Sequence, residues 1–78
     1  MYILTFASTH RVLKAESILK TKDISFRLDP APSVLSTYCD LVISINEGAL
    51  DLALKVLGEN DESPKSIYIR EGEEYICI

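Results

Sequence analysis

The chain has 78 residues, of which 47% are hydrophobic and 26% are charged. This apolar content is too high for a disordered segment, and no apolar run approaches the roughly 18 residues that a membrane-spanning helix needs. A chain of this size buries only about 60% of the surface that its unfolded form exposes, which leaves little room for a deep enzyme pocket. We therefore expect one small domain over residues 1–78.

The charges are distributed unevenly along the chain. A net charge of −4 argues against a general affinity for nucleic acid or for an anionic membrane. Residues 1–39 carry five basic and three acidic side chains, whereas residues 40–78 carry three basic and nine acidic ones, so the first half is better suited to an anion. No leader-like segment precedes the first strand pattern, and we expect a cytoplasmic protein whose cysteines are thiols.

The first part of the chain has the pattern of a strand, a helix and a second strand. Residues 2–7 are rich in strand-forming side chains, and Ser8 and Thr9 follow as a helix-capping pair. Apolar residues then recur at helical spacing over residues 9–22, which predicts an amphipathic helix. Apolar and polar side chains alternate over residues 24–28, which predicts a half-buried strand.

A loop and a second helix follow. Residues 29–40 show no clear period and contain two prolines that are expected to end the preceding strand. Asn46 is placed to cap a helix that begins at Glu47, and Gly58 is placed to end it. Three further strand patterns cover residues 41–46, 66–70 and 75–78.

This order predicts an α+β fold of the ferredoxin-like split βαβ type (βαββαβ) with a short extra C-terminal strand. Right-handed crossovers would place both helices on one face of a mainly antiparallel sheet. The other face would be open or covered by a partner. Phe26 or Tyr68 is expected on that open face, which is a physical reason to expect a homodimer through it.

Cys39 is the main candidate for chemistry. In a split βαβ fold the first and second strands point the same way, so the start of the first helix and the 29–40 loop share one edge of the sheet. A helix start offers unpaired backbone N–H groups and a partial positive charge, which can lower the pKa of a nearby thiol. His10 and Arg11 are candidates to assist a Cys39 thiolate, and Asp40 would oppose them.

Other polar side chains at this edge are candidates for anion binding. They are Ser8, Thr9, Ser36 and Thr37. Cys77 is expected to pack or to lie on an exposed edge, with a resolving role toward an oxidised Cys39 if the last strand returns to the same end of the sheet. Two cysteines and one histidine do not supply the usual four ligands of zinc, and no cofactor motif is present.

Several of these residues resemble a known family. The shared motifs are a Ser-Thr-His helix entry at residues 8–10, a Leu-Lys-Ala-Glu run at residues 13–16, and a proline-rich loop with Pro32, Ser36 and Cys39. Together they resemble small bacterial domains of unknown function called selenium/sulfur carrier-like proteins, over nearly the whole chain. The resemblance implies that Cys39 holds sulfur or selenium between a donor and an acceptor protein. The family commonly has Gly after that cysteine, where this chain has Asp40.

Two classes of function are therefore open. In the first, the protein is a carrier that holds a persulfide or selenide on Cys39. In the second, it is a non-catalytic binding or oligomerisation module in which Cys39 packs as a small hydrophobe and His10 is a solvated surface residue. Lys14 is expected to pair with a nearby carboxylate. A self-contained enzyme is disfavoured, because no glycine-rich phosphate loop and no Ser/His/Asp set is present.

Overall fold

The computed structural model describes residues 1–35 and 40–78. Within them the chain forms five strands and two helices. In chain order they are β1 (Tyr2–Thr5), α1 (Thr9–Thr21), β2 (Arg27–Pro30), β3 (Leu41–Ile45), α2 (Glu47–Glu59), β4 (Ser66–Glu71) and β5 (Glu74–Cys77). Neither α1 nor α2 has the length and apolar composition needed to cross a membrane.

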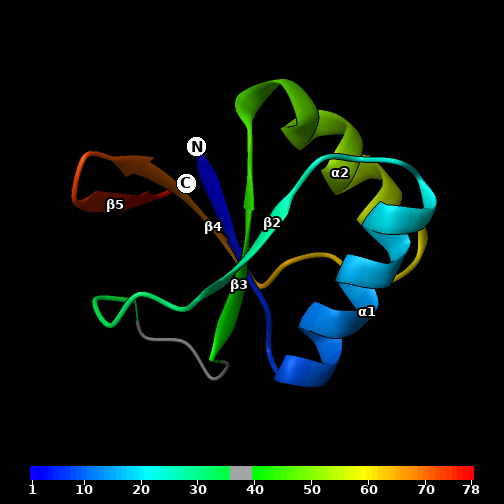
Figure 1. The fold of residues 1–78 in the computed structure, drawn as a ribbon, viewed down its shortest axis with the longest axis horizontal. Coiled ribbons are helices and arrows are strands. Elements are labelled where there is room, and N and C mark those ends of the chain that lie inside the picture. The colour runs from blue at the N-terminus through cyan, green and yellow to red at the C-terminus, as the bar shows by residue number, and fades with distance from the viewer. Residues whose placement is uncertain (36–39) are drawn as a thin grey trace.

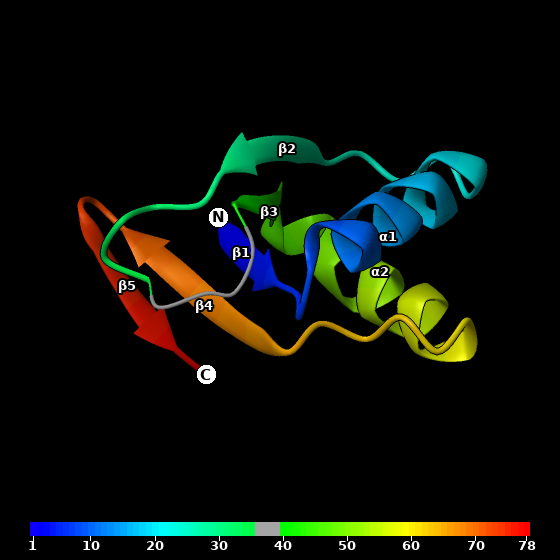
Figure 2. The ribbon, with the colours of Figure 1, turned by 90° about the horizontal axis from the view of Figure 1, so that it is seen from below.

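The strands form a single sheet in the order β2-β3-β1-β4-β5, and every neighbouring pair is antiparallel. The first four strands have the arrangement of a ferredoxin-like split βαβ fold, and β5 extends the sheet beside β4. Figures 1 and 2 show both helices on the same side of the sheet. The predicted fold class is therefore confirmed.

The hydrophobic core lies between the sheet and the two helices. The sheet contributes Leu4 and Ile43, α1 contributes Val12 and Leu19, and α2 contributes Leu57, all of them fully shielded from solvent. Burial of these side chains is the main favourable term in folding. It packs α1 against α2 and β3.

The start of α1 follows the predicted capping pattern. Ser8 has an extended backbone (φ −159°, ψ 163°), and its Oγ accepts a hydrogen bond from the backbone N–H of Arg11 at 3.2 Å. The side chain thus satisfies one of the N–H groups that a helix start leaves unpaired. The prediction of a cap at Ser8 is confirmed.

The ends of α2 differ in part from the prediction. Asn46 occupies the N-cap position, but its side chain makes no capping hydrogen bond. The predicted terminator Gly58 lies inside the helix, which continues to Glu59. Asn60 caps the C-terminus, with its Nδ2 donating to Val56 O at 2.8 Å, and Asp61 then takes the left-handed conformation (φ 56°). The prediction for Gly58 was wrong because two polar residues end the helix instead.

β2 lies three residues further along the chain than predicted. Ile24 does not start the strand, because its N–H donates to Leu19 O at 3.0 Å and its side chain is buried in the hydrophobic core. Pro30 is the last residue of β2 and does not merely follow it. A proline is tolerated there because β2 is an edge strand, and the missing N–H falls on its unpaired side.

The sheet face that points away from the helices is called here the outer face, and it includes Ile3, Val42, Ser44 and Tyr68. The register places Ile3 beside both Ser44 and Tyr68. Ile3 and Val42 are only 3% and 1% exposed, although neither belongs to the helix-side core. The alternative that Phe26 lies on this face was wrong, since Phe26 packs against the helix-side core.

Candidate functional site

One edge of the sheet brings together the segments on which the predicted site depends. β1 and β3 pair with Leu4 opposite Ile43, and β2 and β3 pair with Pro30 opposite Leu41. The end of β1, the end of β2 and the start of β3 therefore share this edge. Figure 1 shows the start of α1 and the start of β3 at the same end of the molecule.

A backbone hydrogen bond closes the base of the β2–β3 loop. The N–H of Ala31 donates to the carbonyl of Asp40 at 2.8 Å, which extends the β2–β3 ladder by one step. Asp40 is the residue that follows Cys39, so the chain beside the candidate cysteine is tied to the end of β2. Cys39, Ser36 and Thr37 themselves lie outside the described residues, and their roles remain predictions.

The described half of this loop runs away from α1. A turn is closed by the N–H of Leu35, which donates to Pro32 O at 3.0 Å. Val34 and Leu35 then line a shallow groove together with residues 73–76 of the β4–β5 hairpin. Figure 1 shows residues 31–35 on the side of β5 and α1 on the opposite side. The described part of the loop therefore lies next to the C-terminal hairpin, and Asp40 lies at the edge that carries the helix start.

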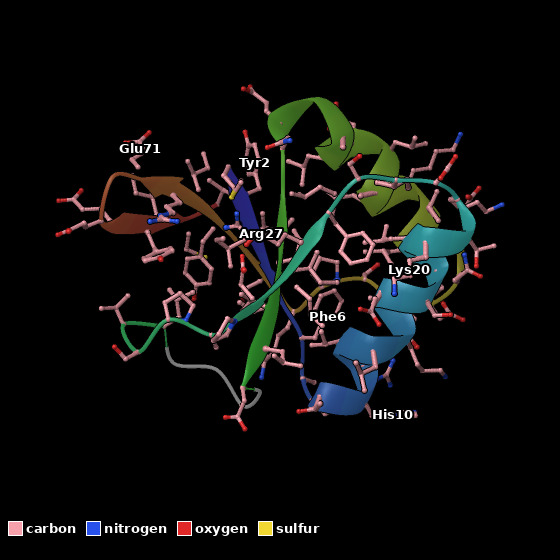
Figure 3. All side chains as sticks on the ribbon, viewed as in Figure 1. Tyr2, Phe6, His10, Lys20, Arg27 and Glu71 are labelled. Carbon is pink, nitrogen blue, oxygen red and sulfur yellow. The ribbon has the colours of Figure 1, made fainter. Side chains whose placement is uncertain are left out.

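The side chains of the α1 entry take different roles. Ser8 uses its Oγ to cap its own helix. Thr9 and His10 are exposed, and Figure 3 shows His10 at the beginning of α1. Exposure leaves His10 accessible to a partner protein, while its predicted support of a thiolate is untested.

Two basic side chains of α1 share one buried carboxylate. Arg11 Nη1 lies 3.5 Å from Glu62 Oε2, and Lys14 Nζ lies 3.7 Å from Glu62 Oε1. The Glu62 side chain is only 6% exposed, against 54% for Arg11 and 56% for Lys14. The predicted pairing of Lys14 with a carboxylate is confirmed. Sequence reasoning missed Glu62, because a single glutamate in a polar connection gives no sign of burial.

Glu62 also changes the expected role of Arg11. The guanidinium of Arg11 is held beside Glu62 by their ion pair, and its Nη1 donates a hydrogen bond to Asp61 O at 3.4 Å. Within the described chain, Glu62 Oε2 accepts no hydrogen bond, so the carboxylate relies on the charges of Arg11 and Lys14. Arg11 is therefore committed to a carboxylate and is a weaker candidate to stabilise a thiolate.

A second polar cluster, on the outer face, was not predicted. Arg27 Nε donates to both oxygens of Asp29 (2.9 and 2.8 Å), and Ser44 Oγ donates to Asp29 Oδ2 at 2.7 Å. Partial burial acts to raise the pKa of Asp29, but the hydrogen bonds from Ser44 and Arg27 and the charges of Arg27 and Arg70 together hold that pKa below its usual value. Strand alternation could have signalled the Arg27–Asp29 pair, since residues two apart share a face.

Cys77 is the one cysteine of the described residues, and it is free and exposed. It lies opposite Tyr68, and the next residue, Ile78, donates its N–H to Ile67 O near the start of β4. Since Ser66 of β4 pairs with the last residue of β1, the chain does return to the end of the sheet that carries the β2–β3 loop. Residues 1–35 and 40–78 contain no cluster of His, Cys, Asp or Glu able to hold a metal ion.

The fold and this edge define a small α+β domain with a ferredoxin-like sheet and a cysteine-containing loop between β2 and β3. Residues 1–69 match the family described as "Putative Se/S carrier protein-like", and the chain belongs to this family. The matched segment includes Cys39 and ends within β4, so β5 and Cys77 lie beyond it. No curated protein and no solved structure matches the chain.

Proposed function

We propose that this protein accepts a sulfur or selenium atom on Cys39 from a donor protein and delivers it to an acceptor protein. The observation that carries the proposal is the family match over residues 1–69. The chain has two cysteines, and Cys39 is the one inside the matched segment. The chemistry suits the reducing cytoplasm, where we expect the protein to act.

For sulfur, the transfer is an exchange that needs no added oxidant. The Cys39 thiolate attacks the outer sulfur of a persulfide on the donor protein, and a new S–S bond forms on Cys39. The S–S bond of the donor breaks, and the donor cysteine leaves as a thiolate. An acceptor thiolate repeats the same exchange on the Cys39 persulfide. The protein therefore needs contact with its partners more than it needs a pocket.

The position of Asp40, at the edge of the sheet that also carries the start of α1, supports a thiolate role for the preceding residue Cys39. The start of α1 has backbone N–H groups and a dipole that favour negative charge. Arg11 is already paired with Glu62. We therefore expect the helix start, and not Arg11, to supply most of the stabilisation of a Cys39 thiolate.

Intact-mass measurement tests the transfer directly. The protein is incubated with a cysteine desulfurase and free cysteine, and the wild type is expected to gain the mass of one sulfur atom, which a reductant removes. Cys39→Ser is expected to gain none, whereas the matched control Cys77→Ser is expected to gain as much as the wild type. Equal loading of Cys39→Ser and the wild type would reject the proposal.

Alkylation kinetics separate a carrier from a binding module with a structural cysteine. In the Cys77→Ser variant only Cys39 can react, so the rate of alkylation against pH reports the pKa of that thiol alone. A carrier is expected to give an apparent pKa below the value of about 8.5 for a free thiol. An apparent pKa at or above this value favours the non-catalytic module.

A further inference from the structure

A hollow of about 160 Å³ opens on the outer face between β2 and the β4–β5 hairpin. Its polar lining comes from three strands: Arg27 and Asp29 on β2, Ser44 on β3 and Arg70 on β4. Its apolar lining includes Ile3 on β1, Val42 on β3 and Tyr75 on β5. The hollow thus combines two guanidinium groups with an apolar base, on the face of the sheet opposite the helices.

Both arginines are anchored through Nε. Arg27 Nε donates to the Asp29 carboxylate, and Arg70 Nε donates to Gly72 O at 3.2 Å. Among the described residues, the terminal nitrogens of Arg70 make no hydrogen bond, and those of Arg27 have only a 4.0 Å contact with Met1 Sδ. An anchored guanidinium loses less conformational freedom when its terminal nitrogens bind a ligand.

The local charge favours an anion although the whole chain is acidic. Asp29 is the one carboxylate that lines the hollow, so it offsets one of the two guanidinium charges. Glu71 and Glu74 lie opposite each other in the β4–β5 register, and strand alternation directs both to the face opposite Arg70. One positive charge therefore remains at the hollow.

We infer that this hollow binds the oxyanion group of a small molecule between the terminal nitrogens of Arg27 and Arg70. Guanidinium groups recognise carboxylate and tetrahedral oxyanions through paired, charge-assisted hydrogen bonds. If the ligand has an apolar part, that part contacts the apolar lining formed by Ile3, Val42 and Tyr75. The ligand is either a free inorganic oxyanion or a small carboxylate. This site does not use Cys39, so it stands independently of the carrier function.

Titration of ¹⁵N-labelled protein, followed by NMR, tests the site. Inorganic phosphate and butyrate are the two probes. Saturable shifts are expected at the amides of Arg27, Ser44 and Arg70. Stronger binding of phosphate identifies a free oxyanion as the preferred source, whereas stronger binding of butyrate identifies a carboxylate with an apolar chain. Absence of saturable shifts with both probes overturns the inference.

Charge-matched variants separate this site from a general charge effect. Arg70→Gln is expected to weaken binding about tenfold, because one charge-assisted anchor is lost. Lys55→Gln removes the same charge from the exposed side of α2 and is expected to leave binding within about twofold. The native-like NMR spectrum of each variant confirms folding. Equal weakening by the two variants contradicts the inference.

A third variant tests the geometry of the guanidinium. Arg27→Lys keeps the charge at the hollow but removes the terminal nitrogens that an Asp29-anchored arginine presents. Binding is expected to weaken at least about threefold for either probe. If Arg27→Lys binds both probes as tightly as the wild type, the anchored guanidinium has no role and the inference is wrong.

Discussion

Asp29 connects two strands of the outer face through a single carboxylate. It accepts hydrogen bonds from Arg27 on its own strand and from Ser44 on β3. Ser44 is only 2% exposed to solvent. The ionised form makes these bonds, so folding favours it over the protonated form. The same bonds hold Arg27 at the hollow, which links the stability of the sheet to the proposed oxyanion site.

The lowered pKa of Asp29 predicts a pH-dependent contribution to stability. A carboxyl whose pKa is lower in the folded state stabilises the fold above its unfolded pKa of about 3.9, and this contribution is lost as the pH falls through the folded value. Asp29→Asn is therefore expected to lower the free energy of unfolding by about 1 kcal/mol at neutral pH. The difference from the wild type should shrink as the pH falls below about 4. Urea unfolding at several pH values measures it.

Asp51→Asn is the matched control for this prediction. Asp51 is exposed on α2 and has no hydrogen bond or ion pair within the described part of the chain. Its substitution removes the same charge without removing a bonded network. A pH dependence of Asp29→Asn that equals that of Asp51→Asn would show that the loss of charge, and not the hydrogen bonds, determines the effect.

The candidate site was predicted in part. The residues that were missed depend on contacts between parts of the chain that are separate in the sequence. The partner of Lys14 was expected but not identified, because Glu62 is nearly fifty residues away in the sequence. The partner of Asp29 on β3 depends on the register between two strands, which alternation alone does not determine. The sequence did indicate the shared edge, because it follows from strand direction in the fold and not from a side-chain contact.

At the level of elements, the two helices begin in different ways. Ser8 caps α1 with its side chain, whereas Asn46 occupies the same position at α2 without a side-chain bond. The two helices therefore allow a comparison, within one protein, of an N-cap residue that makes a side-chain hydrogen bond with one that makes none. This comparison matters for function, because Ser8 was also predicted to bind an anion.

Ser8→Ala is expected to lower the free energy of unfolding by about 1 kcal/mol, the usual cost of losing a capping hydrogen bond. Asn46→Ala is expected to cost clearly less, since no capping bond is lost. Urea unfolding of both variants gives the comparison. If Ser8 acts only as a cap, Ser8→Ala also loads sulfur as the wild type does. Equal destabilisation by the two variants contradicts the assigned role of the Ser8 side chain.

The helices and strands were predicted correctly where the capping residue and the hydrophobic period agreed. They were predicted less accurately where tertiary contacts determined the ends of an element. The predicted helix over residues 9–22 differs from α1 by one residue, because the cap and the apolar period are both local. The alternation over residues 24–28 does place apolar side chains toward the core, but Ile24 precedes β2, whose pairing with β3 starts at Arg27. Gly58 was mistaken for a terminator, since a helix interior tolerates an occasional glycine.

At the level of the molecule, the outer face bears on the predicted homodimer. That prediction expected exposed aromatic side chains on an open sheet face. Tyr68 does lie there and is half-buried, but Ile3 and Val42 are already shielded within the single chain. Pro32 and Tyr75 line the hollow beside them. The apolar area left for a second copy on this face is thus smaller than strand alternation alone suggested, and the homodimer remains a prediction.

β5 and the turn before it are separable from the rest of the fold on two grounds. The family match ends at residue 69, before β5 begins. No residue of β5 belongs to the hydrophobic core, and its strand pairing is with β4 alone. This segment does provide Gly72 and Tyr75 to the proposed oxyanion site. Its removal should therefore affect the two proposed sites differently.

A chain that ends at Glu71 is expected to stay folded, with a free energy of unfolding lower by about 1–2 kcal/mol. Three cross-strand pairs of roughly 0.2–1 kcal/mol each are lost, whereas the like-charged pair of Glu71 and Glu74 is not stabilising. It should still gain one sulfur atom, because Cys39 and the start of α1 are kept. Phosphate binding should weaken as strongly as in Arg70→Gln, because the anchor of Arg70 at Gly72 is removed. NMR spectra, urea unfolding and intact mass measure the three outcomes. An unfolded product, or loss of loading with an intact fold, would show that β5 is an integral part of the carrier.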